Sequence, residues 1–534
     1  MKRLLCFMIA ALLLLTAGCG NTAPAATTTP APVETQPQTP APTPVNDPKL
    51  GWTAAPGETL TLTADTLSGE IQWSSSNPAA AKVDQSGNVQ ALQNRGQVII
   101  TAKAGDAEQK FTVSLCERTV YGNVSLASSD EKLSIGIWNG SYHIFDLEHM
   151  EYLADAGIDL IIGINERWLD GTGMEGLLER AEEFGVSVIV DLRDWDGETV
   201  PEFTENPYLM GYLMYDEPSS SEFESLAALQ EKFRAVMPED TMFFVNLFGE
   251  ACGYESLYGA DYDPAKVDYE ENYLKYFTDT LNAECVSYDA YPLQVGGYIR
   301  SGYIHNFDIS SHRAKELGIP FWYTLLSSGH NTTDGRYVTP TDRELRWQMV
   351  MAMTYGAENL THYVYTTNEA GYEPMVSYGD FQPTAIYDDV KTVNLEFRAW
   401  DDIYMSYDWV GTAKVDAGKE NALVDRLEYD ISFAETGVLT GVESSENLLV
   451  GVFENAGSNA YMITNAGSTI DIDMWMRESF MMEDAQVTLQ LKDGDYRCVA
   501  VIQGGQITYV PVSENNTVSV AINAYDGIFV IPVM

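Results

Sequence analysis

The chain contains few cations, few cysteines and few histidines for its length. Its 534 residues include 30 Lys and Arg against 78 Asp and Glu, which gives a formal net charge of -48. A surface this acidic repels phosphate backbones and anionic lipid headgroups, so we expect no nucleic-acid partner and no domain lying on a membrane. The acidity favours a soluble body that faces a neutral or cationic substrate, although solubility alone also accounts for it.

The cysteines and histidines are too few and too scattered to form a recognisable site. Of six cysteines, two lie in the first 19 residues and four are far apart: Cys116, Cys252, Cys285 and Cys498. No disulfide framework, metal-ligand spacing, HExxH motif or P-loop occurs. We therefore expect no metal and no cofactor, and we expect these cysteines to act as small buried hydrophobes.

The first residues resemble an export signal. Lys2 and Arg3 precede an apolar run, residues 4–15, that is too short to span a bilayer. The run leads into LTAGC, which resembles the lipobox of bacterial lipoproteins. The resemblance implies a signal over 1–19 and a lipid on Cys19. The folded mass would then lie on the extracellular face of the cell envelope, with acyl chains as its only membrane contact. Ordinary secretion is the alternative.

Two segments of different composition follow the signal. Residues 20–47 are rich in Thr, Ala and Pro, which favours an extended linker because the segment has too few large apolar side chains to fold. Residues 48–116 contain strand-length runs separated by Gly, Asn and Pro turns, as in a small β-sandwich. The phrase WSSSNPAAAKVDQSGNVQAL, followed by VIITA, resembles the bacterial immunoglobulin-like group 2 domain. We expect this domain to act as a spacer.

Residues 117–409 have the rhythm of parallel βα units, because strand-like runs alternate with amphipathic helix-length runs. Eight strand-like runs occur, at 133–138, 159–165, 186–192, 211–217, 241–247, 284–292, 319–326 and 360–366. Helical runs occur at 146–157, 174–185, 219–237, 268–282, 309–318, 341–357 and 387–404. The order predicts a (β/α)8 TIM barrel with no good helix between its third and fourth strands.

In such a barrel the carboxyl ends of the strands carry the chemistry. The side chains expected there are acids, amides and aromatic rings, which suit sugars because C–H faces stack on rings and hydroxyls bond amides and carboxylates. We predict substrate binding by eight residues: Trp138, Asn165, Glu166, Asp191, Trp195, Asn246, Tyr291 and Tyr365.

The fourth strand ends in GYLMYDEP, which places Asp216 and Glu217 at its tip. This motif, with SYDAYP, PFWYTL and the run 336–367, resembles barrel domains of bacterial glycoside hydrolases, especially beta-galactosidase-like members. In those relatives a glutamate after the fourth strand is the acid/base and one after the seventh is the nucleophile. Glu217 matches the first position, but IPFWYTLLSSGH contains no acid at the second. The resemblance covers about half the chain.

We therefore predict that Glu217 is the general acid and that its pKa is raised by an enclosed site. Its partner stays open among Asp289, Asp216, Glu369, Asp194 and Glu166. Asp289 is preferred because its strand lies across the mouth, where it would leave room for an attacking water as inverting enzymes require. With Glu217 and Asp289, Asp216 completes the predicted catalytic set.

The helical signal disappears after residue 409. Strand runs at sandwich spacing fill 410–534 and predict a C-terminal antiparallel β-sandwich that packs on the barrel. The whole chain is thus predicted to be a multidomain surface lipoprotein that hydrolyses oligo- or polysaccharide. The alternative is a non-catalytic glycan-binding or adhesive lipoprotein with a degenerate barrel.

Overall fold

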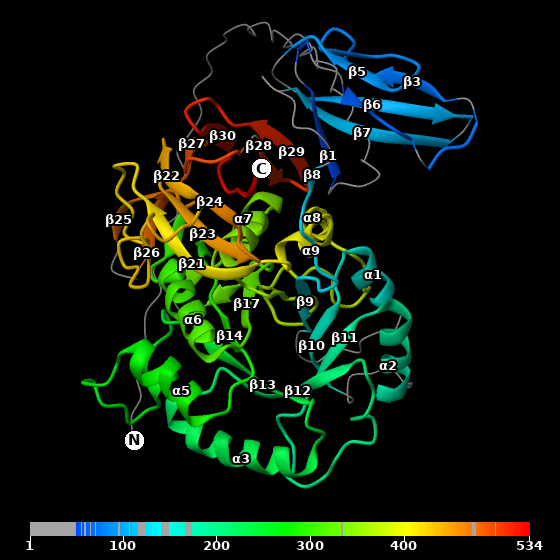
Figure 1. Ribbon diagram of the computed structural model, residues 1–534. Coiled ribbons are helices and arrows are strands. Elements are labelled where there is room, and N and C mark those ends of the chain that lie inside the picture. The colour runs from blue at the N-terminus through cyan, green and yellow to red at the C-terminus, as the bar shows by residue number, and fades with distance from the viewer. Residues whose placement is uncertain are drawn as a thin grey trace, which may run out of the picture. The chain divides into compact units, whose positions relative to one another are not determined.

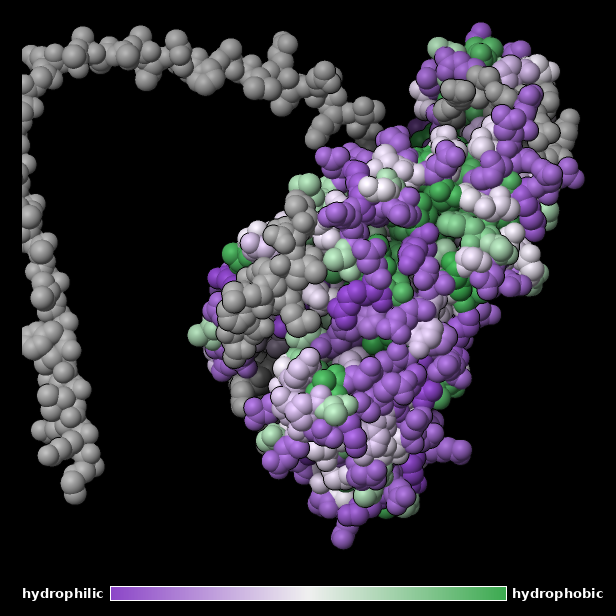
Figure 2. Space-filling view, turned by 90° about the vertical axis from the view of Figure 1, so that its left-hand side faces the viewer, coloured by the Kyte–Doolittle hydropathy of each residue, from purple (hydrophilic) through white to green (hydrophobic). Residues whose placement is uncertain are grey.

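The computed structural model describes residues 50–534 except 55, 58–59, 65, 70, 94–96, 106, 116–123, 140–148, 166–172, 333–334, 473–476 and 497. The predicted signal, linker and Cys19 lie outside these residues. Figure 1 shows the arrangement of helices and strands, and Figure 2 shows one face of the molecule, on which hydrophilic residues dominate.

The N-terminal domain consists of two sheets. One has the order β3-β6-β7-β1-β8, and the other has the order β2-β5-β4. The strands are β1 (Leu50–Ala54), β2 (Leu60–Thr61), β3 (Gln72–Ser75), β4 (Ala81–Val83), β5 (Asn88–Ala91), β6 (Gln97–Ala104), β7 (Ala107–Leu115) and β8 (Val124–Ser125). Trp73 and Phe111 meet in the core with ring centroids 5.6 Å apart. The predicted immunoglobulin-like β-sandwich is confirmed.

A tight turn joins β4 to β5 and explains the DQSGN sequence there. The Asp84 carboxylate accepts the backbone N–H groups of Ser86 and Asn88 at 2.8 and 3.0 Å. Gly87 has a φ of +80°, and a Cβ atom there would lie 2.4 Å from the Leu62 carbonyl oxygen. Only glycine fits this position, because the turn needs a left-handed residue and a close backbone contact.

Eight parallel strands close into a barrel in the order β10-β11-β12-β13-β14-β17-β20-β9. They are β9 (Ser134–Trp138), β10 (Leu160–Ile164), β11 (Ser187–Asp191), β12 (Leu209–Asp216), β13 (Met242–Phe248), β14 (Val286–Asp289), β17 (Phe321–Leu326) and β20 (Asn359–Tyr363). Each lies within, or overlaps, a predicted run. The runs are nearly continuous apolar stretches because barrel strands are buried on both faces.

Helices cover the outside of the barrel (Figure 1). They are α1 (His149–Asp155), α2 (Gly173–Phe184), η2 (Ser220–Glu222), α3 (Phe223–Val236), α4 (Tyr254–Tyr258), η3 (Glu270–Leu274), α5 (Lys275–Thr280), α6 (Tyr303–Leu317), α7 (Asp342–Thr354), α8 (Ala385–Arg398) and α9 (Asp401–Tyr404). As predicted, the described residues between β11 and β12 contain no helix. Helix α6 begins six residues before the predicted start, because polar residues such as Asp308 and Ser310 are buried in it and break the apolar period.

The C-terminal region is a sandwich of a six-stranded sheet, β21-β23-β24-β31-β28-β29, and a three-stranded sheet, β22-β27-β30. Its strands are β21 (Asp408–Val415), β22 (Leu439–Ser444), β23 (Leu448–Asn455), β24 (Ser458–Asn465), β27 (Ala485–Leu491), β28 (Cys498–Gln503), β29 (Gln506–Pro511), β30 (Thr517–Ile522) and β31 (Gly527–Val533). A cluster of buried aliphatic side chains fills the space between the two sheets. The predicted antiparallel β-sandwich is confirmed.

The large sheet of the sandwich packs directly on helix α7 of the barrel. The Trp347 indole N–H donates to the Asn465 carbonyl at 2.9 Å, and the Thr354 and Thr464 hydroxyls bond each other at 2.6 Å. A Cβ atom at Gly451 would lie 2.2 Å from the Thr354 carbonyl oxygen. The glycine therefore allows the sheet to approach the helix closely, and one hydrophobic cluster runs through both parts.

A loop of the barrel also shares a sheet with the C-terminal region. The loop after β14 forms β15 (Leu293–Gln294) and β16 (Tyr298–Arg300), and β16 pairs with β26 (Arg477–Met481), which pairs with β25 (Ser468–Ile472). A separate short hairpin, β18 (Asn331–Thr332) with β19 (Gly335–Arg336), follows β17. The loop that follows the sixth barrel strand is thus held from outside the barrel.

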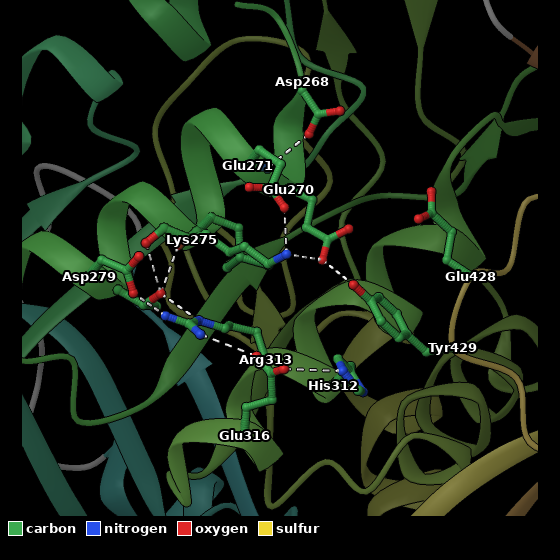
Figure 3. Close-up of polar contacts among 12 residues, drawn as sticks. Asp268, Glu270, Glu271, Lys275, Asp279, His312, Arg313, Glu316, Glu428 and Tyr429 are labelled. Atoms are coloured by element: carbon green, nitrogen blue, oxygen red, sulfur yellow. Dashed lines mark hydrogen bonds and ion pairs between the residues drawn. The ribbon is translucent and has the colours of Figure 1, made fainter.

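On the outer surface, Lys275 links α5 to η3 and Arg313 links α6 to α5. Figure 3 shows Lys275 between Glu270 and Glu271 at 3.0 and 2.6 Å, and Arg313 between Asp279 and Glu316. The ring of His312 stacks on Tyr429 with centroids 3.7 Å apart, which ties α6 to the segment leading into the C-terminal sandwich. This network lies on the helices and contributes no side chain to the carboxylate cluster described next.

Candidate active site

The end of β12 turns sharply and exposes two adjacent acids at the barrel mouth. Asp216 is paired with Asn246 of β13 in the sheet register, and Glu217 follows with a φ of 56°. The Glu217 N–H still donates to the Asn246 carbonyl at 2.8 Å. A non-glycine residue held in this region costs about 1–3 kcal/mol, and such strain gathers at functional sites.

The chain leaves this turn into a helix. Pro218 ends the strand because it has no N–H to donate. The Ser219 N–H donates to the Glu222 carboxylate at 2.9 Å, which forms a capping box for the turn before α3. Glu217 is therefore fixed between a strand end and a capped helix, and its side chain is half-buried at the mouth.

Asn246 joins two of the acids. Its amide nitrogen donates to Asp289 Oδ1 at 3.0 Å and lies 3.5 Å from Asp216 Oδ1. Its amide oxygen accepts the Ser287 hydroxyl at 2.9 Å, which identifies the nitrogen end as the one facing the acids. Asn246 is buried and only 2% exposed. The Asn246 amide nitrogen thus lies between the carboxylates of Asp216 and Asp289.

Glu217 and Asp289 are hydrogen-bonded to each other directly. We name the three carboxylates Asp216, Glu217 and Asp289 the acidic wall. The sequence placed Glu217 and Asp289 across the mouth with room for a water between them, and that expectation is wrong. Strands β12, β13 and β14 are neighbours in the barrel, so the fourth and sixth strand ends are separated by a single strand and their side chains lean together over it.

Burial and mutual repulsion change the protonation of the acidic wall. Burial, then the negative charges of Asp289 and Asp216, raise the pKa of Glu217 far above its usual range. Burial also raises the pKa of Asp289, but hydrogen bonds from Glu217, Asn246 and Tyr291 oppose the rise. At neutral pH Glu217 is therefore the protonated member, and it donates to an ionised Asp289.

The pKa of Asp216 is set by opposing effects. Burial first, and then the charge of Asp289, raise its pKa, while the Arg193 guanidinium lowers it. Arg193 bonds both oxygens of Asp191, with its Nε at 3.0 Å and an Nη at 2.8 Å, and the Asp191 carbonyl accepts the Asn165 amide at 3.3 Å. Asp191 is 6% exposed. Asp191, which the sequence predicted to bind sugar, is thus bound to Arg193 and holds that guanidinium near Asp216.

Aromatic rings line the neighbouring part of the mouth. Tyr291 and Tyr363 stack with centroids 5.4 Å apart, and His330 and Tyr372 stack at 4.7 Å with an interplanar angle of 4°. Tyr337 contacts both Tyr291 and His330. We name these five residues the aromatic wall. Tyr291 belongs to both walls, because it is also hydrogen-bonded to Asp289.

The end of the seventh barrel strand contributes no acid to the mouth. Residues 319–330 include no Asp or Glu. Ser327 and Ser328 follow β17 there and are fully buried, and neither hydroxyl has a hydrogen-bond partner among the described residues. The end of the seventh strand therefore presents buried hydroxyls and no acid.

A shallow cavity of about 540 Å³ lies beside the aromatic wall. The loop after β20 forms most of it, with Glu369, Tyr372 and the half-exposed Tyr378. Glu369 is hydrogen-bonded to Tyr372, and burial, followed by the nearby acids Glu369 and Glu217, raises the pKa of Tyr372. Tyr372 belongs to the aromatic wall and also lines this cavity, so the cavity adjoins the barrel mouth.

Two of the predicted substrate-binding residues are not brought to this site. Tyr365 is fully buried with its ring against His149, so the prediction that it binds substrate is wrong. It follows β20 with its side chain directed to the helix layer. Trp195 packs edge-on against Phe233 of α3 and donates to the Thr199 carbonyl at 2.7 Å. Glu166 lies outside the described residues.

Trp138 lies beneath the mouth. It is the last residue of β9 and packs inside the barrel in a cluster that includes Trp322, Phe244 and the half-buried Tyr363. Trp138 is 8% exposed, so it is available only as part of the floor. Trp322 fills the barrel interior in the same cluster. Cys285 is in the same cluster and Cys498 is also buried, as expected of small hydrophobes.

The residues that sequence reasoning missed are Ser287, Tyr363 and Tyr372. Ser287 and Tyr363 lie on barrel strands within runs that the sequence identified only as apolar. Strict alternation puts Tyr363 and Tyr365 on the same face, so the pattern could not show that Tyr363, the last residue of β20, is the one that lies at the mouth. Tyr372 lies in a loop, and no local pattern marks it.

Comparison with known proteins gives one family match. Residues 53–114 match the model of the bacterial Ig-like domain (group 2). This confirms the resemblance seen in the N-terminal domain. No curated protein matches the chain.

The similar solved structures include glycoside hydrolases. A putative alpha-galactosidase from Bacteroides fragilis NCTC 9343 is 12% identical, with 92% of this chain and 97% of that chain covered and a TM-score of 0.41. A catalytic mutant of a GH42 beta-galactosidase from G. stearothermophilus is 8% identical, with 76% and 99% covered and a TM-score of 0.45. A structure titled glycoside hydrolase is 9% identical, with 76% and 96% covered and a TM-score of 0.46. All three scores are below 0.5, so the assignment of the barrel rests on its strand order.

Two further features bear on the site. Within the described ranges no helix has the length and apolarity needed to cross a bilayer. In that same part of the chain, no group of three or more His, Cys, Asp and Glu side chains is arranged to hold a metal ion.

Proposed function

We propose that this protein is a glycoside hydrolase that acts on oligo- or polysaccharide at the bacterial cell surface, with Glu217 as its general acid. The observation that carries the proposal is Glu217 at the tip of the fourth barrel strand, half-buried and hydrogen-bonded to the Asp289 carboxyl group. Glycosidic cleavage needs a carboxylic acid that keeps its proton at neutral pH, and burial beside other acids is the usual means.

The rest of the mouth suits a sugar. Aromatic rings offer faces for C–H groups, and amides and carboxylates bond hydroxyl groups. In the proposed reaction Glu217 protonates the glycosidic oxygen as the bond breaks, and Asp289 and Asp216 stabilise the positive charge that develops on the sugar ring. Asn246 and Tyr291 hold the two aspartates in place, Asn165 bonds the Asp191 carbonyl beside them, and Trp138 contributes to the floor.

The location is also part of the proposal. A group 2 immunoglobulin-like domain next to a Thr, Ala and Pro-rich linker supports a body held away from the cell, and LTAGC supports anchoring through Cys19. The anchor and linker contribute only location. A variant beginning at Leu50 is therefore expected to keep its activity while losing membrane association.

The decisive test is Glu217→Gln, which keeps shape and hydrogen bonding but removes the transferable proton. Hydrolysis of a glycoside with a poor leaving group is expected to fall by about 10²- to 10⁴-fold, with binding retained. Activated aryl glycosides need less protonation and are expected to be affected less. Glu231→Gln, on the exposed face of α3, is the matched control. Equal losses on both substrate types through KM would contradict the acid role.

The absence of an acid in residues 319–330 favours a second candidate, a glycan-binding lipoprotein with a degenerate barrel. The two candidates differ in one measurement. A binder retains oligosaccharides, as read by calorimetry or glycan arrays, yet releases no reducing sugar from any of them. Such a result across a broad panel would replace the enzyme proposal with the binding one.

A further inference from the structure

The direct bond between Glu217 and Asp289 restricts the mechanism. In retaining glycosidases that use an enzyme nucleophile the two carboxyl groups are about 5–5.5 Å apart, and in inverting enzymes they are about 6.5–9.5 Å apart with a water between them. Hydrogen-bonded carboxyls are closer than either arrangement. Asp289 is thus badly placed both to attack the far side of the sugar and to activate a water there.

Among the described carboxylates, Asp216 lies in the same wall as Glu217 and does not replace Asp289, and Glu166 lies outside the described residues. The seventh strand end has none, and Asp191 is bound to Arg193. Glu373 lies close to Gly329 at that strand end, but Arg336 bonds it at 2.6 Å and Thr339 bonds its other oxygen. Glu369 is exposed and bonded to Tyr372. Of these, only Glu369 is left as an enzyme nucleophile, and the experiment below tests it.

We propose that the substrate supplies the nucleophile, and that the sugar cleaved is a 2-acetamido-2-deoxyhexoside. This inference rests on the proposed glycosidase function and names its substrate class. The 2-acetamido group and the glycosidic oxygen are on adjacent ring carbons, and they are trans to each other in the sugars whose acetamido oxygen can displace the leaving group. Two carboxyls that touch these two groups must also lie side by side, as Glu217 and Asp289 do.

The sugar would exchange one hydrogen bond for two. In the free protein Glu217 donates to Asp289. When the sugar binds, the acetamido N–H takes over as donor to Asp289, and the Glu217 proton turns to the glycosidic oxygen. Tyr291, which also bonds Asp289, keeps that carboxylate oriented and acts as a positioning residue.

The chemistry balances without any further reactant except water. Glu217 transfers its proton to the glycosidic oxygen as the C1–O bond breaks and its electron pair moves to that oxygen. A lone pair of the acetamido carbonyl oxygen forms a new bond to C1, which gives a cationic oxazolinium ring. Asp289 accepts the N–H of this ring and, with Asp216, stabilises its charge. Water then attacks C1, its proton passes to Glu217, and the ring bond to the acetamido oxygen breaks.

The test compares matched pairs of 4-nitrophenyl β-glycosides on the full-length protein, because attack by the acetamido oxygen requires a leaving group trans to the 2-substituent. N-acetylglucosaminide is paired with glucoside, and N-acetylgalactosaminide with galactoside. The acetamido member of at least one pair is expected to have a kcat/KM higher by on the order of 10²-fold or more, because a nucleophile within the substrate has a high effective concentration. Replacing its acetyl group by trifluoroacetyl weakens the carbonyl nucleophile and is expected to lower kcat/KM in step.

Two further readouts separate this mechanism from its rivals. Asp289→Asn is expected to lower kcat on the acetamido sugars far more than it changes KM, and a thiazoline mimic of the oxazolinium ring is expected to inhibit the unmodified protein. If 2-hydroxy sugars are cleaved instead and Glu369→Gln abolishes that cleavage, the inference is overturned while the glycosidase function stands. If neither class is cleaved, the proposed function itself fails.

Discussion

The two walls of the barrel mouth differ in charge, although both are built from strand ends of one barrel. The acidic wall gathers three carboxylates that share protons and one buried amide. The aromatic wall presents stacked rings, and beside it the end of the seventh strand carries buried, uncharged hydroxyls. The difference indicates that the acidic wall is suited to retain a proton and the aromatic wall to contact an apolar surface of the ligand. The predictions below test that division, from the largest expected effect to the smallest.

Asp289→Asn removes the ionised member of the acidic wall. We expect kcat on the preferred glycoside to fall by about 10²- to 10⁴-fold, because the transition state loses a charge-assisted contact. The pKa of Asp289 is raised to about 6, so the acidic limb of the pH–rate profile is expected near that value and to disappear in the variant. A variant with unchanged kcat would place the working carboxylate elsewhere.

Ser327→Asp tests whether the aromatic side can accept an acid. Ser327 is fully buried, and its hydroxyl has no partner among the described residues, so an added carboxylate would be buried and unpaired. We expect a loss of about 3–5 kcal/mol in the free energy of unfolding at neutral pH, measured by denaturant titration. Ser327→Ala is the matched control and is expected to be nearly neutral. A stable aspartate variant would break the division between the walls.

Asp216→Asn tests the charge crowding of the acidic wall through stability. The pKa of Asp216 is raised from 3.8 to about 7, so between these values the folded protein holds a proton that the unfolded chain releases. Stability from this group is therefore full below pH about 4 and falls as the pH rises through about 7. The melting temperature of the unmodified protein is expected to fall as the pH rises over this window. The melting temperature of the asparagine variant is expected to fall less. Parallel curves for the two proteins would contradict the assigned shift.

Tyr372→Ala removes one ring of the aromatic wall. Stacking of an aromatic ring is worth about 0.5–1.5 kcal/mol, so KM for an oligosaccharide is expected to rise by several-fold up to about tenfold with kcat little changed. Tyr254→Ala, an exposed tyrosine on α4, is the control. A large fall in kcat with unchanged KM would instead assign Tyr372 a role in the chemistry.

The sequence was a good guide where a pattern is local. All eight barrel strands lie within or overlap the predicted runs, because each strand is buried on both faces and its apolar stretch is nearly continuous. Glu217 was marked by its place between a strand and a proline. The start of α6 was missed because its buried polar residues conceal the helical period, and the pairing of β16 with β26 was missed because it joins residues about 180 positions apart.

The amino-acid sequence by itself therefore determined the order of domains, the barrel and the position of the candidate acid, since periodicity, turn residues and a strand-end motif express all three. Only the tertiary structure decided that Asp289 touches Glu217, that Asn246 lies between the aspartates and that Tyr365 faces away from the mouth. Those relations depend on barrel closure, which sets neighbours across strands and the direction of each side chain. The protonation of Glu217 follows from the same closure, because burial and nearby charge raise its pKa.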